Sequence, residues 1–172
     1  MIRPVLVFIL FFLPAAFANA QLLKYNSKEE IREAAMVSPD STRQIIEKLV
    51  KECSHYGQAI ESEANQALLQ WLGHHQSLID ENFKVRQEVL SSAKTDSEKR
   101  QLKRMLETQL PQMIEGQFVS ISSVINAAPS KEAKERICRA YVESIKDGKW
   151  DLRDNDPVVY KFLQDRIAAR AK

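Results

Sequence analysis

The sequence predicts an all-α protein, a single compact bundle of five or six mostly antiparallel helices with one disulfide staple. Apolar residues recur every three or four positions through most of the chain, and nowhere does a strict apolar–polar alternation persist. The 172 residues include only 4 Gly and 6 Pro, too few for a turn-rich β sandwich. No composition break or internal repeat divides the chain, so we expect residues 21–172 to form one helical domain.

The first twenty residues have the pattern of an export signal. Arg3 supplies a positive charge, an apolar run covers residues 5–13, and small side chains stand at Ala18 and Ala20. The run is too short to cross a bilayer as a helix, which takes about twenty residues. We therefore expect residues 1–20 to be a cleavable signal peptide, with an uncut anchor as the alternative. No Asn-x-Ser/Thr sequon follows, so the periplasm is the expected destination and an extracellular location the alternative.

Cap residues predict where the first helices begin. Ser27 and Glu30 have capping-box spacing and predict a short helix that ends near residue 37. Ser38 followed by Pro39 has the order of an N-cap and a first helical residue. The apolar stripe beyond them continues to residue 72, so the second helix is expected to be long.

Two glycines punctuate this second stripe. Gly57 is expected only to bend the helix, because the apolar spacing continues on both sides of it. Gly73, with His74 and His75, is expected to end the helix and to leave both histidines in solvent at its end. A third helix then follows to about residue 92.

The remaining helices are predicted from further starts and stops. The residues that mark their ends are Thr95 and Pro129 for a fourth helix, Ser130 and Gly148 for a fifth, and Asp156 with Pro157 for the last. Pro111 falls inside the fourth stripe, where a proline is expected to kink the helix.

The two cysteines are most simply a disulfide. An exported protein meets an oxidising compartment, in which thiol pairs become bonded. Cys53 and Cys138 lie on the apolar stripes of the second and fifth helices, so their bond requires these helices to be neighbours. No C-x-x-C motif is present, which favours a structural staple over redox catalysis, while two free buried thiols are the alternative.

The chain offers no credible catalytic set, metal site or cofactor motif. The three histidines lack metal-ligand spacing, and the aspartates between residues 147 and 156 lack the pattern of a calcium loop. Lys and Arg total 25 against 23 Asp and Glu, so the net charge is close to zero. Nucleic-acid binding is therefore not expected, and neither is enzyme activity, a metal or a cofactor.

Two surfaces are candidates for binding a protein partner. Trp150 stands beside Asp151 and Asp154 in an acidic connection, where it forms either an exposed recognition loop or a contact that tucks onto the bundle. The second surface is a basic cluster near the start of the fourth helix, made of Lys99, Arg100, Lys103 and Arg104. This cluster is either a solvated helix face or a contact for an acidic partner or an anionic lipid surface.

The segment from Cys138 through Tyr141 to Gly148 resembles the cysteine-tyrosine segment of helical periplasmic immunity proteins, which neutralise secreted amidase toxins. Ala140 replaces the glycine that usually stands beside the tyrosine, and the further cysteines of that group are missing. The resemblance covers about eleven residues and assigns no family.

The expected function is that of an exported, non-enzymatic protein-binding domain, such as an inhibitor, an immunity protein or an accessory factor. One alternative is a chaperone-like protein or small-ligand carrier with an apolar groove between helices, where Met105 and Met113 beside Pro111 would supply an adaptable surface. Another is an enzyme whose site the sequence does not reveal. The kink at Pro111 also permits a homodimer.

Overall fold

The computed structural model describes residues 24–171, which contain helices and no strand. The helices are α1 (Lys28–Ala35), α2 (Ser38–Ser54), α3 (Gln58–Ser92), α4 (Asp96–Arg104), the π-helical turn η1 (Met105–Gln109), α5 (Leu110–Asn126), α6 (Lys131–Lys146), α7 (Leu152–Asn155) and α8 (Pro157–Arg170). The predicted all-α bundle is confirmed. The predicted signal peptide lies outside the described residues.

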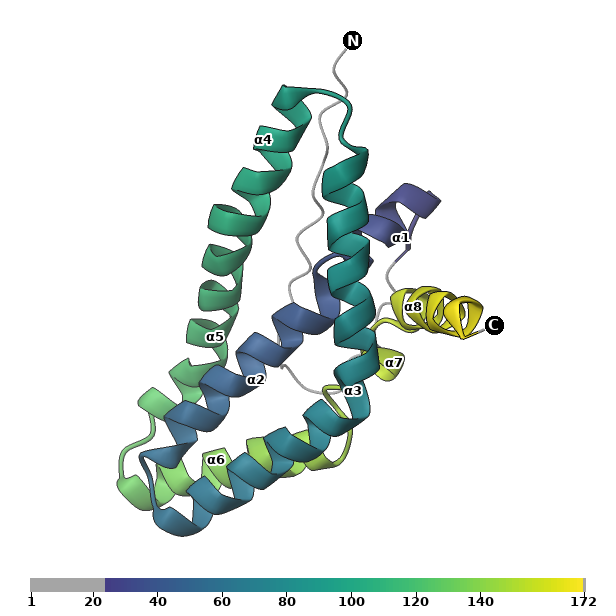
Figure 1. Cartoon of the computed structure of the whole chain (residues 1–172). Coiled ribbons are helices and arrows are strands. Elements are labelled where there is room, and N and C mark those ends of the chain that lie inside the picture. Colours follow the sequence, from purple (N-terminus) through teal and green to yellow (C-terminus); the bar gives the residue numbers. More distant parts are fainter. Residues whose placement is uncertain (1–23, 172) are drawn as a thin grey trace.

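The larger part of the described chain is a unit of α2, α3, α5 and α6. α2 packs against α3 and α5, and α6 packs against the same two helices, so the four close on themselves (Figure 1). Their inward side chains form the larger hydrophobic core, which includes Ile46, Leu49, Ile60, Ile125 and Val142. These side chains are almost inaccessible to water, and their burial is the main force that assembles the unit.

A smaller core within residues 24–171 lies against the C-terminal part of α3. α1 and α8 pack on each other and on α3, and they bury Met36, Val85, Val159 and Leu163. The ribbon of α3 changes direction about midway along its length (Figure 1). The first part of α3 therefore serves the larger core and the second part serves the smaller one.

The prediction of where the long helices break was wrong. The chain reverses at Gly57, whose φ of +155° is rarely adopted by residues with a side chain, and this separates α2 from α3. α3 instead runs without interruption through Gly73 and the histidines. An interior glycine costs a helix only about 1 kcal/mol. The burial of α3 against both cores outweighs that cost.

Four of the predicted caps are confirmed. The capping side chains of Ser27, Thr95, Ser130 and Asp156 accept from the amides of Glu30, Glu98, Ala133 and Val159. Ser38 is not a cap, because it lies inside α2 and the N-cap position is Val37, which makes no side-chain cap bond. The amide of Val37 donates to the carbonyl of Ala34, so the chain passes from α1 into α2 through one tight turn.

Pro111 does not end its helix but changes the helix type just before it. In a regular helix the proline ring would clash with the carbonyl of Glu107, four residues earlier. The chain forms the wider turn η1 there, in which the amide of Leu110 donates to the carbonyl of Met105, five residues earlier. The stretch from α4 to α5 is thus continuous, and the predicted kink is a π turn.

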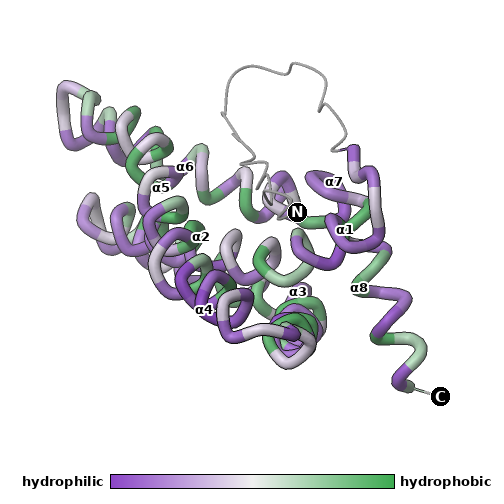
Figure 2. The backbone as a smooth tube through the Cα atoms, turned by 90° about the horizontal axis from the view of Figure 1, so that it is seen from above, coloured by the Kyte–Doolittle hydropathy of each residue, from purple (hydrophilic) through white to green (hydrophobic). Residues whose placement is uncertain are grey.

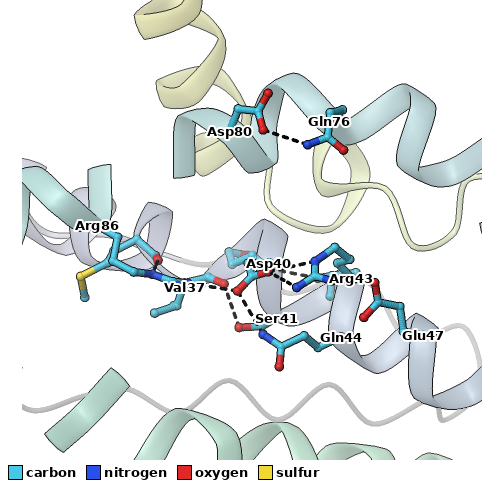
Figure 3. Close-up of polar contacts among 12 residues, drawn as sticks. Val37, Asp40, Ser41, Arg43, Gln44, Glu47, Gln76, Asp80 and Arg86 are labelled. Atoms are coloured by element: carbon cyan, nitrogen blue, oxygen red, sulfur yellow. Dashed lines mark hydrogen bonds and ion pairs between the residues drawn. The ribbon is translucent and has the colours of Figure 1, made fainter. Parts of the chain in front are cut away.

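Asp40 fixes the junction of α1 and α2 to α3 (Figure 3). Its carboxylate is only 3% exposed and accepts from Arg43 and Gln44 on α2, at 2.7 and 3.0 Å. Arg86 of α3 donates to the same carboxylate at 3.2 Å and to the carbonyl of Met36 at 3.2 Å. A buried carboxylate needs such partners, so the three segments are held in one arrangement.

A second buried carboxylate attaches α8 to α3. Glu81 is 1% exposed, and its Oε1 lies 2.8 Å from Nε of Arg166. Arg166 also donates to Glu88 at 2.7 Å, and hydrogen bonding from this guanidinium lowers the pKa of the Glu88 carboxyl. Next to Glu81, the amide of Asn82 donates to the carbonyl of Ala35 at the end of α1. Polar contacts therefore orient both helices of the smaller core.

The predicted disulfide is present. Cys53 on α2 and Cys138 on α6 are bonded, with their Cα atoms 5.4 Å apart, and both residues are buried in the larger core. The bond closes a loop across a sequence separation of 85 and holds α2 and α6 across the four-helix unit.

Replacing both cysteines by alanine is expected to lower the free energy of unfolding by about 4 kcal/mol, because the unfolded chain regains the entropy of the long loop. Urea denaturation followed by circular dichroism measures the loss. Dithiothreitol is expected to destabilise the wild type and to leave the double variant unchanged. Equal sensitivity of the two proteins to the reductant would contradict a bonded pair.

Arg166→Met is expected to lower the free energy of unfolding by about 3 kcal/mol, because it leaves the buried Glu81 carboxylate without its main partner. The matched double variant Glu81→Met/Arg166→Met removes both charges and is expected to recover most of that loss. Chemical denaturation of the wild type, Arg166→Met, Glu81→Met and the double variant gives the coupling free energy between the two side chains. Additive losses would show that the pair is not coupled.

Candidate functional site

The connection from α6 to α8 is a tightly bonded turn. Gly148 has a φ of +74°, and a Cβ at this position would lie 3.1 Å from Oδ2 of Asp151. The amide of Asp151 donates to the carbonyl of Gly148 at 2.9 Å, and the side-chain amide of Asn155 donates to the carbonyl of Lys149 at 2.9 Å. Gly148 follows the end of α6, as predicted, and it does so in the left-handed region. This turn sets the position of Trp150.

Of the two alternatives for Trp150, the structure has the one in which it tucks onto the bundle. The partly buried indole packs against the larger core, and its Nε1 donates to Oγ of Ser144 at 2.8 Å. An interface anchor needs an accessible apolar face. Trp150 instead uses both its ring and its N–H inside the fold.

Asp151 also faces inward, toward His75. The imidazole of His75 is 5% exposed, its Nε2 lies 3.3 Å from Oδ1 of Asp151, and its Nδ1 lies 2.8 Å from the carbonyl of Trp71. The Trp71 ring stacks on the imidazole at 4.1 Å between centroids. The expectation that His75 stands in solvent at a helix end was wrong, because α3 continues through it and the α6–α8 connection covers it.

Of the four aspartates in the predicted acidic connection, Asp147 and Asp154 have exposed side chains. Asp154 pairs with the neighbouring Arg153 at 3.0 Å, and this hydrogen bond lowers the pKa of its carboxyl. Asp156 is buried as the cap of α8 and accepts from the hydroxyl of Tyr25. Burial raises the pKa of Asp156. Asp151 and Asp156 thus contribute to the fold, whereas Asp147 and Asp154 remain on the surface.

The basic cluster lies apart from this loop. Lys99, Arg100, Lys103 and Arg104 are all exposed on α4, which has no buried residue. α4 stands at one end of the molecule, at the tip of the hairpin that it forms with the last turns of α3 (Figure 1). The structure therefore does not bring the two predicted binding surfaces together.

An apolar groove that the sequence analysis did not identify lies between the end of α5 and the start of α6. It has a volume of about 640 Å³. Its lining is almost entirely of small or apolar residues, namely Ser123, Val124, Ala127, Ala128, Pro129, Ala133, Ile137 and Ala140, with Arg136 as the one charged member. We call this feature the α5–α6 groove.

The groove continues onto the outer face of α5 beyond Glu115, where the helix carries no charged residue. Two aliphatic side chains of α5, Val119 and Val124, are 54% and 51% exposed on this side of the molecule. The fifteen residues from Gly116 to Ser130 contain no Asp, Glu, Lys or Arg, although 28% of the whole chain is charged. This charge-free run is the feature of the sequence that could have indicated the groove. Its apolar spacing alone does not distinguish a helix face exposed to solvent from one buried in the core.

The arrangement at the groove is suited to binding rather than to bond chemistry. Small side chains on both walls leave room for apolar groups of a partner. Within residues 24–171 the guanidinium of Arg136 has no hydrogen-bond or ion-pair partner, so it is available to a carboxylate at the rim. In the same residues no cluster of potential ligands could hold a metal ion. Nor is any helix there long and apolar enough to cross a membrane.

Comparison of the chain with protein-family models, curated proteins and solved structures found no match.

Trp150→Ala is expected to lower the free energy of unfolding by about 2 kcal/mol, somewhat less than the loss of a fully buried tryptophan, because the ring packs on the larger core. Asp154→Ala in the same connection is the matched control and is expected to change stability by less than about 0.5 kcal/mol. Urea unfolding of both variants measures the difference. A Trp150→Ala protein as stable as the wild type would indicate that the indole is free to bind a partner.

Proposed function

We propose that the protein is an exported, non-enzymatic protein-binding domain, and that it binds its partner through the α5–α6 groove. The observation that carries the proposal is an apolar groove beside the exposed part of α5 that follows Glu115 and carries no charged residue. A contiguous exposed apolar surface is typical of a site that a partner covers. Trp150 and Asp151 are engaged within the fold, so the proposed interface differs from the loop that the sequence suggested.

The groove favours a partner that presents an apolar helix or loop with a carboxylate near one end. Ser123, Ala127 and Ala140 have short side chains, which let a partner backbone approach closely. Arg136 at the rim would pair with the carboxylate and fix the register of the bound segment. An inhibitor, an immunity protein or an accessory factor would use such a surface.

Export of the domain is part of the proposal. A disulfide between buried cysteines is typical of proteins that fold outside the cytoplasm. The pattern of residues 1–20 agrees with this compartment, and the periplasm remains the destination that we propose.

A small apolar ligand is the second candidate for the same groove. Its volume of about 640 Å³ falls within the range of small-molecule sites. Such sites enclose most of the ligand surface, whereas Val124, Ala127 and Ala140 are exposed. The open wall favours a macromolecule, which brings its own surface to cover the groove.

A photo-crosslinking amino acid at Val119 is expected to capture one protein in the native host. Val124→Asp, five residues further along α5, is expected to abolish the adduct, because it places a charge in the apolar contact. Val158→Asp on α8 replaces another exposed valine, 37% accessible, and is the matched control that should retain the adduct. Non-reducing electrophoresis and mass spectrometry identify the product.

Both aspartate variants are expected to keep the unfolding free energy of the wild type within about 0.5 kcal/mol, because the replaced side chains are exposed. An adduct that survives Val124→Asp, or the absence of any adduct, would contradict the proposed interface. An adduct of two copies of this chain would identify the partner as a second copy.

A further inference from the structure

The outer face of α4 is a concentrated positive surface. Lys99, Arg100, Lys103 and Arg104 have the spacing i, i+1, i+4 and i+5, which puts them on one side of a helix. Leu102 on the other side packs toward the smaller core. The cations therefore project outward, and we call them the α4 basic face. Figure 2 looks onto this end of the molecule and shows α4 mainly in the hydrophilic colour.

Two of the carboxylates near the α4 basic face, Glu98 and Glu88, are engaged by other groups, whereas Asp96 lies on the same side of the helix as Lys99 and Arg100. Glu98 accepts from the amides of Lys94 and Thr95 in the capping box. Asp96 lies in the first turn of the helix, where the unpaired backbone amides favour a negative charge. Glu88 on α3 is engaged by Arg166 and Arg170 of α8.

Only one member of the face has an ion pair among the described residues. Lys103 lies 3.8 Å from Glu107, and both side chains are more than 60% exposed. A pair so open to solvent contributes little. Apart from this open pair, the four cations have no ion-pair partner among the described residues, and the face keeps an excess of positive charge over the carboxylates of Asp96 and Glu107.

The shape of this surface is suited to a flat array of phosphates. α4 forms the convex tip of a hairpin, and neither of the two pockets described for residues 24–171 is lined by an α4 residue. None of the large exposed apolar side chains lies on α4. Protein interfaces rely on apolar or aromatic anchors that fit into pockets, and α4 offers neither. A lipid headgroup layer requires only charge.

We propose that the α4 basic face holds the protein against an anionic phospholipid surface. Attachment through this face leaves the α5–α6 groove free, because the groove lies at the opposite end of the α4–α5 stretch (Figure 1). The contact is peripheral and electrostatic, so it weakens as salt screens the charges. It is independent of the function proposed for the groove.

Sedimentation with sucrose-loaded vesicles tests the proposal, using the chain recovered from the periplasm of an expression host. The protein is expected to sediment with vesicles of 70% phosphatidylcholine and 30% phosphatidylglycerol in 50 mM NaCl, where the Debye screening length is roughly 14 Å. It is expected to be released in 300 mM NaCl, where the screening length is shorter. Vesicles of phosphatidylcholine alone are expected to bind none. Each cation near the surface contributes about a fivefold increase in partitioning.

Lys99→Gln/Lys103→Gln is accordingly expected to weaken binding by roughly 25-fold. Lys149→Gln/Lys161→Gln removes two equally exposed lysines elsewhere and is the matched control, expected to bind as the wild type does. Val124→Asp in the α5–α6 groove is also expected to leave vesicle binding unchanged, which separates this proposal from the proposed function.

Three results would overturn the proposal. One is equal binding to vesicles with and without phosphatidylglycerol, and another is an equal loss of binding in the α4 variant and its lysine control. The third is tighter binding to duplex DNA than to the anionic vesicles at the same phosphate concentration, which would assign the α4 basic face to nucleic acid.

Discussion

The fold depends on α3, a single helix whose first and second parts are buried in two different hydrophobic cores. Its first part packs against α2 and α6, and its second part packs against α1 and α8. A straight amphipathic helix presents a single apolar stripe to a single core. α3 changes direction about midway, so each part of the helix faces its own core. The buried polar groups of the second part then determine which helices pack against it. Arg86 reaches the start of α2, and Glu81 receives Arg166 from α8.

These contacts determine which surfaces remain available. Because α8 packs against α3, the connection after α6 crosses over His75. Asp151 in this connection contacts His75, and Trp150 donates a hydrogen bond to Ser144. α5 has neighbours in α2 and α6 on its inner side and none on its outer side among the described helices. Its outer face, with Val119 and Val124, is therefore exposed although no charged residue follows Glu115 in the helix.

The continuous stretch from α4 to α5 carries two surfaces of opposite character. Its α4 end is basic and convex, whereas its α5 end is uncharged and borders the α5–α6 groove. The π turn before Pro111 keeps the two ends in one rod, since a broken helix would let them move independently. A protein attached to an anionic surface by α4 would present the groove away from that surface, where a partner has access to it.

Local periodicity, cap chemistry and the number of thiols were enough to predict the helical class, the pairing of the cysteines and four helix starts, at Ser27, Thr95, Ser130 and Asp156. The sequence by itself could not decide which glycine breaks the long stripe, since an interior glycine is cheap and only the packing of both halves of α3 outweighs it. Nor could it tell whether Trp150, His75 or the stripe of α5 faces water, because an apolar or aromatic residue at helical spacing looks the same on a core and on an interface. The exposure of these residues depends on the tertiary packing, because the side chains that cover each of them come from helices distant in the chain.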